Sequence, residues 1–186
     1  MLHRSPTRIH NRHTNHFIAW REHFKYSGKI EATYDKTKDE TLVFFNLMRI
    51  RAATNLEWEG AAVTSDERVG FSMYFTYPGQ NLTTPKWVGI GIASVTHEPK
   101  QYGDYKLTIV ADKQMLSIGT LTVHEKGATR SSPQLAVQML EGVIPYEQFL
   151  QIANARKVKM QIGYKELPLD MENLEAIRDL ASHTAP

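Results

Sequence analysis

From Ile30 onward, hydrophobic and polar residues alternate with the period of two that is typical of β-strands. The clearest segment is VGFSMYFTYPG, in which every second residue is large and apolar. Phe71, Met73, Phe75 and Tyr77 fall on one face of this strand, and the residues between them fall on the other. The pattern therefore predicts a strand with one face in a hydrophobic core.

Three pairs of such segments flank short polar turns, which predicts three hairpins. KIEATYD pairs with TLVFFNLMRIR across KTKDE, YKLTIV pairs with QMLSIGTLTVHE across ADKQ, and KVKMQIG pairs with KELPL around Gly163. QLAVQMLEGVI is expected to form a further strand.

The segment WVGIGIASV has one large face and one nearly bare face. Its aliphatic side chains lie at Val88, Ile90 and Ile92. Gly89 and Gly91 supply the opposite face, where a missing side chain allows a large ring or another backbone to approach closely. We therefore expect close packing of this kind against the glycine face.

The apolar spacing changes to that of helices in three places. PYEQFLQIANA begins with proline, a favourable first helical residue. DMENLEAIRDLAS has Asp170 as the expected N-cap and an apolar stripe through Leu174 and Ile177. Residues 14–28 form a short amphipathic pattern that also suits a helix.

Together these elements predict a mostly β (α+β) fold, an antiparallel β-sandwich with two or three short helices, of which the C-terminal one packs on the sheet. The pattern indicates roughly eight or nine strands. The expected organisation is a basic, histidine-rich N-terminal arm over residues 1–28 and a single sandwich-like domain over residues 29–186.

Composition and charge narrow the function classes. The chain is 41% hydrophobic and has no cysteine, which excludes disulfides and thiolate chemistry. Residues 1–29 carry a local charge of +5 within a net charge of +2, so the remaining residues carry −3. Because a nucleic-acid-binding domain usually has a basic folded face, we do not expect a nucleic-acid partner. Apolar runs fall short of the roughly 20 residues that span a bilayer.

The N-terminal arm lacks the apolar core of a secretion signal, so the expected location is cytoplasmic, or exported if the native N-terminus differs. Its HNRHTNH stretch spaces His10, His13 and His16 three residues apart. Zinc would need a third or fourth well-placed ligand, and no carboxylate precedes Glu22. We interpret the stretch as a solvated cationic arm, with a metal site as the alternative, and we expect no cofactor.

Catalytic motifs for a nucleophilic serine, a phosphate loop or a zinc protease do not occur in the sequence. A histidine–carboxylate pair could still form between strands. The candidates for such a pair are His97, His124, Asp104 and Glu141.

The loop TYPGQNLTTPKW is the best candidate for ligand contact, because aromatic residues flank a polar loop. The candidate binding residues are Tyr77, Asn81 and Trp87. The alternative is that both rings belong to the core.

Five segments of the chain are similar to segments of other proteins: YFTYPG, DYKLTIVADKQMLSIG, IPYEQFLQIANA, VKMQIG and LEAIRDLAS. From about residue 30 the chain resembles a group of uncharacterised bacterial proteins expected to be β-rich. The group has no established activity, so the resemblance implies a fold but transfers no catalytic residue.

Three functional hypotheses follow. The first is a non-catalytic binding or structural module that contacts a small molecule, carbohydrate or peptide through loop aromatics. The second is a hydrolase or lyase with a histidine–carboxylate site assembled across strands. The third treats the N-terminal arm as an electrostatic tether to anionic surfaces. The sequence leaves the oligomeric state open.

Overall fold

The computed structural model describes residues 30–50, 68–96, 102–126 and 136–184. Within these ranges the chain forms eleven strands and two helices, and the strands make two antiparallel sheets. The predicted mostly β sandwich with a C-terminal helix is confirmed. The predicted helix at residues 14–28 lies outside the described residues.

The larger sheet contains seven strands. In spatial order, six of them are β1 (Ile30–Asp35), β2 (Glu40–Phe45), β4 (Arg68–Pro78), β5 (Trp87–Thr96), β9 (Ala136–Pro145) and β8 (Thr122–Lys126). The short β3 (Met48–Arg49) pairs with β4 beside β2. The segment predicted as one strand after KTKDE is therefore divided into β2 and β3.

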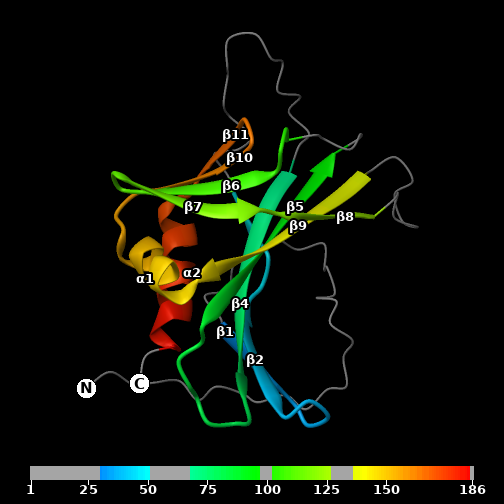
Figure 1. Ribbon diagram of the computed structural model, residues 1–186, viewed down its shortest axis with the longest axis vertical. Helices are drawn as coiled ribbons and strands as arrows, with labels where there is room; N and C mark the ends of the chain where they lie inside the picture. The colour runs from blue at the N-terminus through cyan, green and yellow to red at the C-terminus, as the bar shows by residue number, and fades with distance from the viewer. Residues whose placement is uncertain (1–29, 51–67, 97–101, 127–135, 185–186) are drawn as a thin grey trace.

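The smaller sheet has the order β11 (Lys165–Pro168), β10 (Val158–Ile162), β6 (Lys106–Ala111) and β7 (Gln114–Thr120). Its strands β6 and β7 cross β4 of the larger sheet at a steep angle (Figure 1). The β6–β7 and β10–β11 hairpins turn where the sequence predicts them.

The predicted second strand of the β6–β7 hairpin is divided at Leu121. β7 pairs with β6 in the smaller sheet, whereas β8, after Leu121, pairs with β9 in the larger one. Two irregularities accompany this change of sheet. The register with β7 shifts between Leu107 and Thr108 of β6, and Gly119 of β7 has a positive φ of 128°. Bulges and bends of this kind let one strand turn a corner between packed sheets.

The two helices lie together beside the sheets (Figure 1). In α2 (Met171–Ser182), Asp170 is the N-cap as predicted: its side chain accepts a hydrogen bond from the Asn173 backbone N–H. α1 (Tyr146–Asn154) follows β9 directly, so Pro145 is the residue before the helix. Arg178 of α2 donates to the carbonyl oxygens of Ala153 and Ala155 at the end of α1. This contact ties the two helices together.

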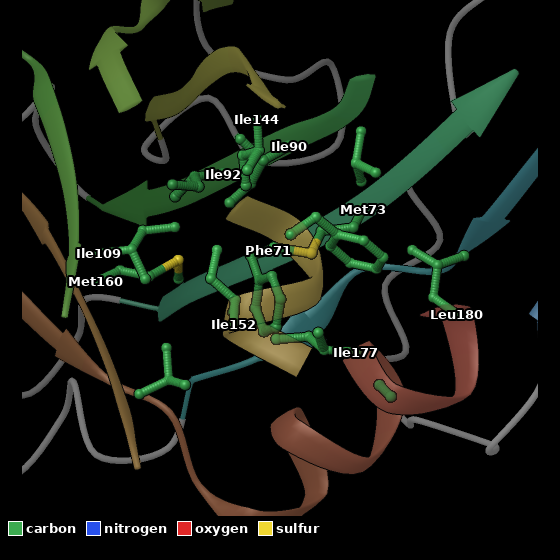
Figure 2. Close-up of a cluster of buried hydrophobic side chains, with 14 of the residues drawn as sticks. Phe71, Met73, Ile90, Ile92, Ile109, Ile144, Ile152, Met160, Ile177 and Leu180 are labelled. Atoms are coloured by element: carbon green, nitrogen blue, oxygen red, sulfur yellow. The ribbon is translucent and has the colours of Figure 1, made fainter. Parts of the chain in front are cut away.

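The core receives side chains from both sheets and both helices. Figure 2 shows Phe71 and Ile90 of the larger sheet, Ile109 of the smaller sheet, and Ile152 and Ile177 of the helices around one cluster. Each of these five side chains is buried. The face of the larger sheet that points away from this cluster is called the outer face below.

No helix within the described ranges has both the length and the apolar character needed to cross a membrane.

Candidate functional site

The two aromatic residues that flank the β4–β5 loop lie on opposite faces of the larger sheet. Tyr77 is 8% exposed and packs beside Phe75 in the core, with ring centroids 6.3 Å apart. Trp87 is 55% exposed and lies on the outer face, because its neighbour Val88 points into the core. Asn81, between them, is exposed in the loop. Of the predicted binding residues, Asn81 and Trp87 are therefore accessible and Tyr77 is not.

Tyr74 occupies the space that the glycines of β5 leave on the outer face. It pairs with Gly89 across the β4–β5 ladder, and a Cβ atom on Gly89 would overlap the Tyr74 ring. The predicted close approach of a large ring is thus confirmed. Burial, with a contribution from the charge of Glu141, raises the pKa of Tyr74 above its usual 10. The phenol is consequently protonated at neutral pH and can donate a hydrogen bond.

His124 of β8 and Glu141 of β9 meet on the same face. The imidazole Nε2 lies 3.2 Å from the carboxylate Oε2, and the two side chains are 51% and 45% exposed. The register places them together: Glu141 is opposite Thr122, and His124 is opposite Met139, so the two residues are diagonal neighbours. The structure therefore brings together two of the four residues predicted for a histidine–carboxylate pair.

The other two predicted members are placed differently. Asp104 is exposed in the turn before β6, where its carboxylate accepts from the Lys106 backbone N–H and lies 3.6 Å from the Lys106 ammonium. His97 lies outside the described residues.

The accessible part of the outer face runs along β9. Pro145 is opposite Trp87, Val143 is opposite Gly89 and Glu141 is opposite Gly91, so these positions form consecutive rows. Val143 is 56% exposed. We define the outer-face site as Tyr74, Trp87, His124, Glu141 and Val143.

Farther along β5 from Trp87 the same face closes. Ser72 and Ala93 are 2% and 1% exposed, although alternation puts both on the outer face. The accessible surface of the site is therefore confined to the Trp87 end of β5, to β9 from Glu141 to Pro145 and to His124 of β8.

The structure does not test the predicted alternative of a metal site in the N-terminal arm. In the ranges that the structure describes, no three histidine or carboxylate side chains come together as a metal site would require. His10, His13 and His16 lie outside those ranges.

Tyr74 and Val143 belong to the site but were not among its predicted residues. The bare glycine face of β5 was the signal for Tyr74, because it predicted a ring without saying which strand would supply it. No feature of the sequence indicated Val143, because whether this valine is exposed depends on which face of β9 packs on the core.

No protein-family model, no curated protein and no solved structure matches the chain. The resemblance to uncharacterised bacterial proteins thus stays a prediction.

Proposed function

We propose that the protein is a non-catalytic binding module that contacts its ligand through the outer-face site, with Trp87 as the main contact. The observation that carries this proposal is the 55% exposure of Trp87 at the start of a strand whose next seven residues are buried. Apolar rings with a polar N–H are favoured in binding sites because they bury much area and can also hydrogen-bond.

The backbone around Trp87 is held firmly, which favours a role in binding. Val88 and Ile90 are fully buried on the opposite face of β5, and the Tyr146 N–H donates to the Lys86 carbonyl oxygen at 3.1 Å. A ring on a rigid strand loses little conformational entropy when a ligand packs on it. Trp87 therefore has the properties of a preorganised contact residue.

Trp87→Ala is expected to weaken ligand binding at least about tenfold, as truncation of a central aromatic contact usually does. The binding of soluble glycans and of aromatic-rich peptides can be measured by isothermal titration calorimetry. Tyr164→Ala is the matched control, because Tyr164 is a similarly exposed ring, at 58%, in the turn between β10 and β11. Equal affinities of Trp87→Ala and wild type, or no binding by wild type of either probe class, would contradict the proposal.

The contact between His124 and Glu141 favours a second candidate function, hydrolysis of an activated ester or a related bond. The imidazole Nε2 lies 3.2 Å from the carboxylate, and a neutral imidazole has one ring nitrogen that could accept a proton from water. The resulting hydroxide would add to the ester carbonyl, the ester C–O bond would break, and the imidazolium, stabilised by Glu141, would return its proton to the departing oxygen.

In this second function, His124→Gln should lower the rate of p-nitrophenyl acetate hydrolysis by about a hundredfold, the usual contribution of a general base. His183→Gln, at the end of α2, is the control histidine substitution. A wild-type rate no faster than that of His124→Gln would rule out the hydrolase.

A further inference from the structure

We infer that the ligand of the outer-face site is an uncharged oligosaccharide that lies along β9, with one sugar ring on Trp87 and hydroxyl groups of another bound by the His124–Glu141 pair. This inference rests on the proposed binding function and adds the class and orientation of the ligand.

The spacing of the site favours a chain of several units. Trp87 is opposite Pro145, and Glu141 is four residues from Pro145 on the same face of β9. At the usual rise of a strand this separation is roughly 13 Å. Val143, 56% exposed, lies between the two ends. One sugar ring cannot reach both ends of this surface, whereas a short chain of rings can.

The two ends of the surface differ in chemistry, as a sugar requires. Trp87 offers a flat apolar face, which suits the C–H face of a pyranose ring. Glu141 provides acceptors, His124 provides an N–H, and the protonated phenol of Tyr74 provides an O–H near Glu141. Hydroxyl groups both donate and accept, so they can satisfy all three side chains.

The charge of the site favours a neutral ligand. Its one carboxylate, Glu141, is already paired with His124. None of the five residues of the site is lysine or arginine, the side chains that usually bind carboxylate or phosphate groups. An acidic polysaccharide would meet Glu141 with a charge of the same sign.

The position of the site within the sheet disfavours an extended peptide. At Gly89 and Gly91, β5 is paired on both sides, with β4 and β9, and from Val137 to Glu141 β9 is paired on both sides, with β5 and β8. A peptide that lies over these residues cannot add a strand to the sheet there, so its own N–H and C=O groups would find no backbone partners. A sugar chain has no such groups in its backbone and leaves unused hydroxyls in water.

The test compares neutral hexasaccharides with their monosaccharides by calorimetry on the full chain. The probes are β-1,4-linked glucose, α-1,4-linked glucose and β-1,4-linked N-acetylglucosamine, together with an aromatic-rich peptide and a uronic acid hexamer. The variants are Trp87→Ala and Glu141→Gln. Glu166→Gln is the matched control, because Glu166 is a half-exposed carboxylate paired with Lys159 at 2.6 Å on the smaller sheet.

We expect at least one neutral hexasaccharide to bind about tenfold or more tightly than its monosaccharide, because only the longer ligand reaches both ends of the site. Glu141→Gln should weaken hexasaccharide binding about threefold to tenfold and leave monosaccharide binding unchanged, since one charged hydrogen-bond partner is lost. Glu166→Gln should bind as wild type does. Unchanged thermal unfolding of each variant would show that the fold is intact.

The outcomes separate the two proposals. If Trp87→Ala abolishes saccharide binding but Glu141→Gln has no effect, the orientation along β9 is wrong and the binding function stands. If the peptide or the uronic acid hexamer binds more tightly than the neutral saccharides and Trp87→Ala abolishes that binding, the ligand is not a neutral sugar. The proposed binding function of the outer-face site then stands. If saccharides bind and Trp87→Ala has no effect, both proposals fail. No binding of any saccharide at about 1 mM overturns the sugar assignment.

Discussion

Gly163→Ala is expected to destabilise the protein by at least about 3 kcal/mol, near the upper end of single substitutions. Gly163 has a φ of 53°, and this left-handed conformation alone costs alanine about 1–2 kcal/mol. A Cβ atom at this position would also overlap the Tyr102 carbonyl oxygen, a backbone atom that cannot rotate away. To remove this overlap, the β10–β11 turn would have to move away from the segment before β6. That movement would break the hydrogen bond from the Gly163 N–H to the Lys106 carbonyl oxygen.

Gly79→Ala separates the two causes of this loss. Gly79 also has a positive φ, 67°, but the nearest atom to an added Cβ would be Asp39 Oδ1 at 3.9 Å. Urea unfolding of both variants should therefore show a clearly smaller loss for Gly79→Ala. Equal losses would mean that backbone conformation alone accounts for the effect and that Tyr102 does not restrict the turn.

Phe71→Ala is expected to lower the free energy of unfolding by about 3–5 kcal/mol, the usual cost of a truncated core phenylalanine. Phe71 is fully buried and packs edge-on against Phe45 of β2, with ring centroids 5.5 Å apart. Its removal would leave a cavity between the larger sheet and the helices, close to Ile152 and Ile177 (Figure 2). The loss can be measured from the urea midpoint at constant slope.

Trp87→Ala provides the contrast for this measurement, because it removes a still larger ring from the outer face. Since Trp87 is half-exposed, its truncation should destabilise the fold much less than Phe71→Ala. A comparable loss for both variants would show that the Trp87 ring is part of the core, which would also remove the basis of the binding proposal.

Three of the five residues of the outer-face site were predicted from the sequence, but their arrangement was not. The sequence singled out Trp87, His124 and Glu141 because their chemistry suits binding or proton transfer. It also proposed Tyr77 and Asp104, which resemble them in type. Alternation along β4 and β5 places Tyr77 in the core and Trp87 on the outer face. The position of Trp87 could be decided only once Val88 was known to face the core.

The pairing of strands determined which residues of the site lie close together. His124 lies 17 positions before Glu141, and only the β8–β9 register makes them neighbours. That register depends on β8 leaving the β6–β7 hairpin at Leu121, a turn that the uniform alternation of the segment does not signal. The Tyr74 ring lies over β5 because Gly89, which is opposite Tyr74, leaves space for it.

The sequence by itself determined the hydrophobic period of each segment: a period of two along the strands and a helical period in α1 and α2. It also identified Asp170 as a cap and placed Gly163 in a turn. These features depend on interactions within a few residues, so local pattern is sufficient to predict them. Only the tertiary structure decided which face of each strand met the core and which strands became neighbours. Those choices depend on burying the most apolar surface across the whole chain, and they determined that Trp87, Tyr74, Glu141 and His124 share one surface.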